Sequence, residues 1–217
     1  MSLRVALWAV LAGLPFAFAA AWALARWRFP GKALFDIAVH LPLVVPPVVV
    51  GYVLLLLLGR RGPLGGWLWE TFGFSVAFSW KGAAVASAIM GFPLMVRAIR
   101  LSLETVDRRI EAAARTLGAR PLDVLATITL PLAAPGLLTG AILGFARSLG
   151  EFGATITFVS NIPGETWTLP LALSALAQVP GREAAALRLV AISVALAVIA
   201  LLGSELVARR MRARRGL

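Results

Sequence analysis

Two residues of opposite charge, Arg147 and Glu151, stand within a long apolar segment of the sequence. A charged side chain alone at the centre of a bilayer costs about 2.5–3.5 kcal/mol on insertion scales. The four-residue spacing places both side chains on one face of a helix, where they can pair. The residues therefore form either a structural ion pair that neutralises itself or one part of a polar pathway through a membrane.

Further polar side chains continue from this pair along the same segment. They are Ser148, Thr155, Thr157 and Asn161. In one continuous helix, the seven-residue spacing of Ser148 and Thr155 places both on a neighbouring face. Gly150 and Gly153 would thin that helix and permit the close approach of another. A polar pathway would use these side chains, so they are candidate pathway residues.

A second apolar segment, Phe35–Leu58, contains Pro42, Pro46 and Pro47. Each proline removes a backbone donor and clashes with the preceding helical turn, so the segment must bend or break. A break at membrane depth is tolerated only where protein or a water-filled cavity satisfies the freed carbonyls. Pro46 and Pro47 are therefore candidates for the pathway wall, and a bent packing helix is the alternative. We expect His40, the only histidine, to be a hydrogen-bonded core residue rather than a ligand.

The sequence lacks the usual motifs of an enzyme site. It contains no G-x-x-x-x-G-K-[ST] phosphate loop, no H-E-x-x-H and no G-x-S-x-G, and it has no cysteine. Without a phosphate loop, the chain cannot hydrolyse ATP by that route. No pair of carboxylates lies within one apolar segment, and no internal repeat of the kind found in many secondary transporters is evident. A catalytic or metal-binding function is not expected.

The composition is that of an integral membrane protein. Of the 217 residues, 60% are hydrophobic and 14% are charged, whereas soluble domains have about 25% charged residues. The net charge of +11 could indicate nucleic-acid binding. However, most basic residues flank apolar segments, as membrane topology requires. We therefore predict an all-α, polytopic helix bundle that contacts the lipid bilayer and no nucleic acid.

Five segments are long and apolar enough to cross a bilayer core of about 30 Å. They are Val5–Ala25, Phe35–Leu58, Trp80–Met95 and a little beyond, Leu132–Phe158, and Leu187–Val207. The first could instead be a cleaved signal peptide. It is long for that role and basic residues follow it, which favours a retained span. A distortion is expected at Gly91-Phe92-Pro93, near the end of the third span.

The basic residues predict the orientation of these spans. With the N-terminus outside and the C-terminus inside, residues 26–34, 97–131 and 208–217 are cytoplasmic and hold 14 of the 21 basic residues. Residues 59–79 then form an external loop rich in Gly, Pro and aromatic residues. For residues 165–180 we predict a short helix that is re-entrant or interfacial. A sixth full span in this segment would place the arginine-rich tail outside.

The most polar internal segment, Glu111–Pro131, predicts two short helices joined by a sharp turn. Gly118 suits the left-handed position that follows a helix C-terminus. Pro121 suits the first turn of the next helix, because its missing N–H has no partner there. The second helix is expected to stop at Pro131. Ala112, Ala113 and Ala114 would give the first helix a surface that another protein can approach closely.

This segment resembles the EAA loop of ABC importer permeases, which docks into a groove of a separate ATPase. The family pattern is Glu-Ala-Ala, three residues, Gly, nine residues, Ile-x-Leu-Pro; here Gly118 to Ile128 keeps the nine-residue gap. The family's glutamate position holds Ala112, and Glu111 lies one residue earlier. An ordinary cytosolic helical hairpin is the alternative. By resemblance, the coupling residues are Glu111, Ala112, Ala113, Ala114, Leu117, Gly118, Ala119, Pro121, Ile128, Leu130 and Pro131.

Three further blocks resemble the molybdate-importing branch of these permeases, with the sulfate permeases as the second choice. They are His40–Gly51, Phe92–Arg100 and Arg147–Thr166. The resemblance implies a type I importer fold over residues 1–217, with a coupling loop at 97–131. It also implies a homodimer in a bacterial inner membrane, with a cytoplasmic ABC ATPase dimer and a periplasmic oxyanion-binding protein as partners. ATP and Mg²⁺ would belong to the ATPase, and this chain would bind no cofactor. A proton-coupled transporter is the remaining alternative, for which only Glu151 could titrate within the membrane.

Overall fold

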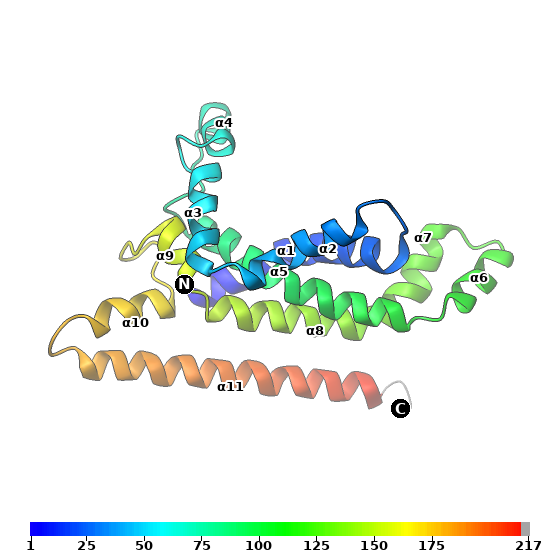
Figure 1. The fold of residues 1–217 in the computed structure, drawn as a ribbon. Helices are drawn as coiled ribbons and strands as arrows, with labels where there is room; N and C mark the ends of the chain where they lie inside the picture. Colours follow the sequence, from blue (N-terminus) through cyan, green and yellow to red (C-terminus); the bar gives the residue numbers. More distant parts are fainter. Residues whose placement is uncertain (214–217) are drawn as a thin grey trace.

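The structure is a computed structural model that describes residues 1–213, and the side chains of residues 1–200, 202 and 203. Every regular element in these residues is helical, which confirms the all-α fold class (Figure 1). The helices are α1 (Ser2–Arg26), α2 (Lys32–Val44), α3 (Pro47–Leu58), α4 (Pro63–Phe72), α5 (Trp80–Thr105), α6 (Arg108–Thr116), α7 (Pro121–Val124), the π-helical turn η1 (Leu125–Thr129), α8 (Leu130–Leu149), α9 (Gly153–Val159), α10 (Leu169–Ala177) and α11 (Glu183–Ala213).

Helices α1, α5 and α8 pack against one another and form the centre of the molecule. Small residues allow α5 and α8 to approach closely. Gly136, Gly140 and Gly144 recur every four residues on α8, and a Cβ at Gly144 would lie 2.8 Å from the side chain of Met95. This is the small-residue spacing by which helices associate in membranes. Helix α1 supplies buried residues to the same core, including Ala17 and Leu24, so it is an integral part of the bundle.

The second predicted span is broken as its prolines require. Helix α2 ends at Val44, α3 begins at Pro47, and the two helices are bent by 112°. Figure 1 shows α3 leaving the direction of the bundle and carrying α4 away from it. The prediction that residues 59–79 are an irregular loop is wrong for Pro63–Phe72, which form α4. Pro63 begins that helix at a position where a missing N–H costs nothing.

The third span is longer than predicted and carries no break. Helix α5 continues through Pro93 to Thr105, so the expected distortion does not end it. Arg97 and Arg100 are part of this helix and not of a loop. The charge of Arg100 is stabilised in this helix by ion pairs with Asp36 of α2 at 2.9 Å and with Glu104 at 2.8 Å. The segment between the third and fourth spans is correspondingly shorter.

The fourth span differs from its prediction at both ends. Pro131 does not stop a helix, because Pro121–Leu149 form one 29-residue helix that includes the wide turn η1. Within that turn the Leu130 N–H donates to the carbonyl of Leu125, five residues back, and this change of register accommodates the proline. At the other end the helix stops at Leu149, and α9 begins only at Gly153.

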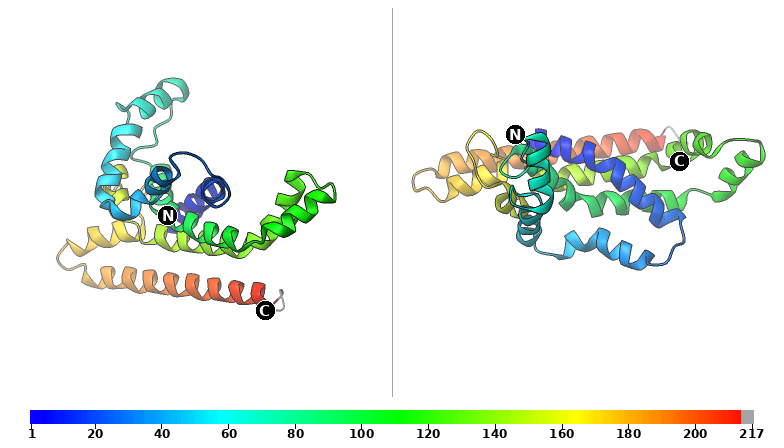
Figure 2. Two further views of the ribbon diagram at one scale, coloured as in Figure 1. Left: turned by 45° about the vertical axis from the view of Figure 1, so that its right-hand side comes forward. Right: turned by 90° about the horizontal axis from the view of Figure 1, so that it is seen from above.

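The ends of the helices gather at two ends of the molecule. The chain's N-terminus lies near α9 and α10, whereas the α6–α7 hairpin lies at the opposite end, toward which α11 runs (Figures 1 and 2). Helix α10 has nine residues, which agrees with the short helix predicted for residues 165–180. Four helices of the described part are long and apolar enough to cross a membrane, and the bent pair α2–α3 makes a fifth. Arg214 and Arg215 of the predicted basic tail lie outside the described residues.

Candidate functional site

The α6–α7 hairpin has the local geometry that the sequence predicts. The Asp107 side chain caps the start of α6 by accepting a hydrogen bond from the Arg109 N–H at 2.9 Å. Gly118 has φ +90°, and the Ala119 N–H donates to the Ala114 carbonyl at 3.1 Å, which closes the end of the helix. Pro121 then starts α7. The turn between the two helices therefore depends on a conformation that a β-branched residue rarely adopts.

The hairpin exposes several apolar residues among its charged ones. Leu117 and Leu122 are 89% and 76% exposed, and Ala112 and Ala113 are exposed beside them. These exposed leucines make the hairpin a candidate surface for contact with another protein. Leu130 and Ile128 are half-buried at the base of the hairpin, so they fix its position and are not its exposed surface.

Glu111 lies apart from this exposed surface. It is 8% exposed, and its Oε1 accepts hydrogen bonds from Arg26 Nη2 and from Thr129 Oγ1, both at 2.8 Å. Arg26 is the last residue of α1, and Thr129 ends the π-helical turn before α8. A second bond, from Arg108 Nη2 to the Ala25 carbonyl at 3.0 Å, also ties α6 to α1. The carboxylate therefore joins three helices inside the protein.

The charged pair near the other end forms as its spacing predicts. Arg147 Nη1 lies 2.5 Å from Glu151 Oε2, and Glu151 is 2% exposed. Glu151 does not continue the helix of Arg147, because it occupies the break between α8 and α9. Its Oε1 accepts the Ala154 N–H at 2.8 Å and so caps the start of α9. The carboxylate both neutralises Arg147 and holds the turn between the two helices.

Because of this break, the neighbouring polar residues do not share the single helix face that the sequence predicts. Ser148 ends up on α8 and Thr155 on α9, so the two do not share one continuous helix. The hydroxyls of Thr155 and Thr157 donate to carbonyls of their own turn, Phe152 at 2.9 Å and Gly153 at 3.0 Å. Buried Ser148 Oγ and Asn161 Oδ1 have no hydrogen-bond partner among the described residues. Their hydrogen-bonding capacity is unused within the described part of the chain.

The two broken spans meet at this place. The Pro47 side chain packs on Gly153, where a Cβ would lie 2.7 Å from Pro47 Cβ. A Cβ at Gly51 of α3 would lie 2.5 Å from the Ala154 carbonyl oxygen and 2.9 Å from Thr157 Cβ. The chain thus brings the proline break of α2–α3 against the α8–α9 break. Pro47 meets the start of α9 at Gly153, and Gly51, one turn further along α3, meets Thr157.

Three residues of these sites were not found from the sequence. Arg26 was interpreted only as a topology signal, although its position at the end of α1 places it against Glu111. Thr129 was overlooked because a threonine before a Leu-Pro pair carries no motif. Thr166 holds the turn after α9 by donating to the Ser160 carbonyl at 3.0 Å and accepting the Ile162 N–H at 2.8 Å. Among the described residues, no cluster of three or more histidine or acidic side chains could hold a metal ion.

Comparison with known protein families shows which family the chain belongs to. Residues 9–213 match the family described as the binding-protein-dependent transport system inner membrane component. The chain belongs to this family. It is therefore a multi-pass inner-membrane protein.

Two curated relatives are similar to the chain in sequence, and two solved structures are similar to it in fold. The chain is 61% identical over 216 residues to the molybdenum transport system permease protein ModB of Escherichia coli K12, covering 100% of this chain and 94% of the relative. It is 55% identical over 216 residues to ModB of Haemophilus influenzae, with the same coverage of both chains. The fold is similar to that of a bacterial alginate importer, with a TM-score of 0.74, 15% identity and coverage of 96% of this chain and 77% of the other. It is also similar to the MetNI methionine transporter in inward-facing conformations, with a TM-score of 0.69, 14% identity and coverage of 97% and 91%.

Proposed function

We propose that this chain is the membrane-spanning subunit of a binding-protein-dependent importer for molybdate. The observation that carries the proposal is 61% identity to a molybdenum permease over the full length of the chain. A sulfate permease of Synechocystis is 40% identical over 156 residues, covering 72% of this chain and 56% of that protein. Sulfate transport is therefore the weaker alternative, since both the identity and the coverage are lower.

In this proposal the energy for transport comes from another protein, since the sequence has no phosphate loop with which to hydrolyse ATP itself. In this proposal two copies of the chain form a homodimer, and two copies of a cytoplasmic ATPase bind ATP and Mg²⁺. A periplasmic oxyanion-binding protein delivers the substrate. The chain itself binds no cofactor. Transport then proceeds by alternating access, with ATP binding at the ATPase opening the pathway outward.

The α6–α7 hairpin is the proposed contact with the ATPase. Its exposed leucines, Leu117 and Leu122, would insert into the partner, and exposed Ala112 and Ala113 would permit close approach. Gly118 sets the angle between the two helices. A hairpin whose apolar side chains face outward gains stability when a partner removes them from water.

Glu111 takes a different role from the exposed residues of the hairpin. Because it binds Arg26 and Thr129 inside the protein, we propose that it transmits movement of α6 to α1 and to the start of α8. A rigid, buried connection between three helices moves them together. In the family pattern the glutamate stands at the position of Ala112, one residue after Glu111. A role that differs from that of the exposed residues is consistent with this offset.

The proposed pathway lies where the two broken spans meet. An oxyanion that has lost its water needs hydrogen-bond donors, and Ser148 Oγ is a buried hydroxyl with no partner in the described residues. Arg147 is partly exposed and supplies positive charge next to it, while Glu151 limits the net charge. A pathway that is only weakly positive attracts an anion without holding it permanently.

The orientation follows from charge. The described residues 26–34, 97–131 and 208–213 lie at the end of the molecule with α6 and α7 and hold 12 of the 21 basic residues, so we place that end in the cytoplasm. The N-terminus, α9 and α10 are then on the periplasmic side. This orientation presents the hairpin to the ATPase and the break before α9 to the binding protein.

Uptake into reconstituted vesicles tests the proposal. The permease, its ATPase and the binding protein are reconstituted together, and accumulation of molybdate is measured with and without ATP. Tungstate, sulfate and phosphate are added in turn as competitors. Molybdate uptake that requires ATP and resists a large excess of sulfate is expected. Preferential sulfate uptake would favour the sulfate alternative, and uptake driven by a proton gradient without ATP would contradict an ABC importer.

A further inference from the structure

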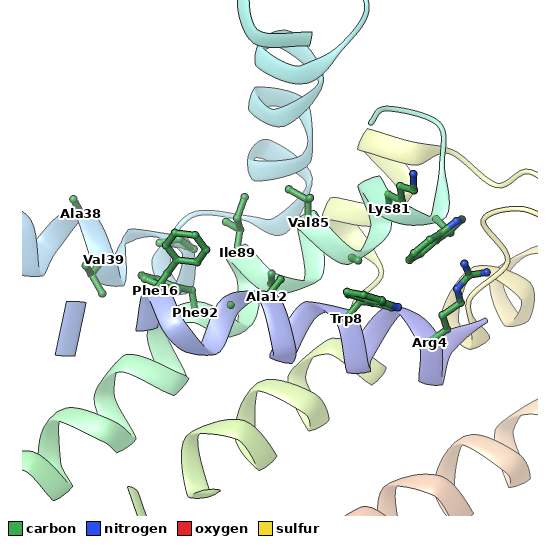
Figure 3. Close-up of a pocket in the computed structure, with 15 residues that line it drawn as sticks. Arg4, Trp8, Ala12, Phe16, Ala38, Val39, Lys81, Val85, Ile89 and Phe92 are labelled. Carbon is green, nitrogen blue, oxygen red and sulfur yellow. The ribbon is translucent and has the colours of Figure 1, made fainter. Parts of the chain in front are cut away.

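A groove lies between α1, α2 and α5, and its lining includes no residue of the hairpin or of the α8–α9 break. It has a volume of about 960 Å³ and is lined almost entirely by apolar side chains. In Figure 3, Trp8, Ala12 and Phe16 of α1 face Val85 and Ile89 of α5 across it. Trp8 and Phe16 remain 51% and 71% exposed, so the groove is open along its length.

Two cations stand together at one end of this groove. Figure 3 shows Arg4 and Lys81 at the same end, with the apolar lining extending away from them. The Arg4 guanidinium lies 3.8 Å from the ring centroid of Trp80, and Lys81 Nζ lies 4.2 Å from that of Phe74. Neither cation forms an ion pair with a carboxylate in the described part of the chain. Their charge is therefore available to an anionic group.

The length of the groove matches one leaflet of a membrane. Arg4 and Phe16 are twelve residues apart on one helix, which corresponds to about 18 Å at 1.5 Å per residue. One leaflet of a hydrocarbon core of about 30 Å is about 15 Å deep. Trp8 and Trp80 near the charged end suit the interface, where indole rings settle. An acyl chain whose head group lies at Arg4 would thus reach the vicinity of Phe16.

We propose that this groove binds an anionic phospholipid. Its phosphate would contact Arg4 and Lys81, and one acyl chain would run along Trp8, Ala12 and Phe16. The combination of unpaired cations at one end and an apolar channel of leaflet length fits an amphiphilic anion. A transported inorganic oxyanion does not fit, because the depth of the groove offers almost no polar atoms. The bound lipid would join the broken span α2 to α1 and α5.

Native mass spectrometry of the full permease in complex with its ATPase tests this site. The delipidated complex is titrated with dioleoyl phosphatidylglycerol or with dioleoyl phosphatidylcholine at equal concentrations. We expect phosphatidylglycerol to bind at least about tenfold more tightly, since two basic residues near the membrane surface attract the anionic head group. The double substitution Arg4→Gln/Lys81→Gln should remove this preference. The matched control, Arg60→Gln/Arg61→Gln, removes two exposed charges outside the groove and should leave it unchanged.

Variants that obstruct the groove distinguish a lipid-binding site from attraction by surface charge alone. Ala12→Trp and Ala88→Phe each place a ring in the groove, and either should reduce the binding of both lipids by about tenfold. Equal binding of the two lipids to the unchanged protein would overturn the proposal. An equal loss of the preference for phosphatidylglycerol in Arg4→Gln/Lys81→Gln and in Arg60→Gln/Arg61→Gln would also overturn the proposal. Val53 lies on the exposed surface of α3. A disulfide formed in high yield between Ala12→Cys of one copy and Val53→Cys of another would show that a second copy covers the groove, and would also overturn the proposal.

Discussion

The carboxylate of Glu111 and the guanidinium of Arg26 form a buried ion pair with an N–O distance of 2.8 Å, although 85 residues separate them in the sequence. Their side chains are 10% and 9% exposed. The pair connects the end of the first span to the first helix of the hairpin. Thr129 completes the connection by donating a hydrogen bond to the same oxygen. Any movement of α6 must therefore shift α1 or break this contact.

The first prediction concerns this pair. Arg26→Met or Glu111→Leu leaves one buried charge without its partner, which costs about 3–5 kcal/mol in comparable sites. The double variant removes both charges and should lose less stability than the sum of the single losses. The thermal stability of the purified complex measures the losses in the single and double variants. Arg28→Met, an exposed residue of the same segment, is the control and should change little. Single losses that simply add in the double variant would contradict a direct interaction.

Transport measurements on the same variants test the proposed transmission of movement. The double variant should assemble with the ATPase, because the exposed surface of α6 and α7 is unchanged. However, ATP hydrolysis should respond less to loaded binding protein, since the rigid connection to α1 is gone. Full stimulation in an assembled double variant would show that Glu111 has only a structural role.

The second prediction concerns Arg147 and Glu151. Glu151→Gln leaves Arg147 without its counter-ion, and it replaces the carboxylate that caps α9 by a neutral amide. Arg147→Met leaves a nearly fully buried carboxylate unpaired. Both single variants should lower the yield of folded protein and the rate of uptake, and the double variant should recover part of the yield. A double variant whose yield falls by the sum of the single losses would exclude the pair as a unit.

The sequence predicted local features more successfully than long-range contacts. The turn at Gly118, the start of α7 at Pro121 and the break near Pro46 were all predicted, because each depends on the backbone restrictions of one residue. The Arg147–Glu151 contact was predicted because four residues separate its members. Arg26 and Glu111 were not paired, because nothing in the sequence indicates that α1 ends beside α6.

The errors arose where tertiary contacts change a helix boundary. Pro131 would end an isolated helix, but the π-helical turn η1 absorbs it, and Pro121–Leu149 continue as one helix. Glu151 was assigned to a continuous fourth span, whereas its carboxylate caps a new helix. The four-residue spacing of Gly136, Gly140 and Gly144 is present in the sequence, but only the structure shows that these glycines pack α8 closely on α5.

The third prediction concerns the contact between α3 and α9. A methyl group at Gly51 would lie 2.5 Å from the Ala154 carbonyl oxygen, so Gly51→Ala must push the helices apart. Overpacking of this kind costs about 1–3 kcal/mol. Gly66→Ala on α4 is the matched control, because its Cβ would meet only the Arg60 carbonyl at 3.4 Å. Melting temperatures of the two variants should differ clearly, and equal values would contradict the packing of α3 on α9.

The fourth prediction concerns orientation. The chain has no native cysteine, so single cysteines can be introduced without background. Thr116→Cys at the end of α6 should be protected from an impermeant thiol reagent in intact spheroplasts. Thr71→Cys on α4 should react, because it is exposed and lies on the proposed external side. Reaction at Thr116 with protection at Thr71 would invert the topology.

The fifth prediction concerns Gly118, whose φ of +90° a valine cannot adopt without strain. Apart from its two neighbours in the chain, no atom lies within 4 Å of the position that a Cβ would occupy, so the fold itself has room for the side chain. Gly118→Val should therefore insert and assemble as a dimer, yet change the angle of the hairpin and crowd its partner. Gly181→Val is the matched control, because Gly181 has φ +81°, equally open surroundings and a position in the turn between α10 and α11.

ATP-driven molybdate uptake by vesicles that contain Gly118→Val or Gly181→Val tests the central claim most directly. We expect Gly118→Val to lose at least about nine-tenths of the uptake, since a cost of about 1.4 kcal/mol at the docking site already weakens binding tenfold. It should also retain less ATPase on purification, while Gly181→Val retains both uptake and ATPase. Normal uptake and normal co-purification of the ATPase with Gly118→Val would contradict a hairpin that couples this chain to its motor.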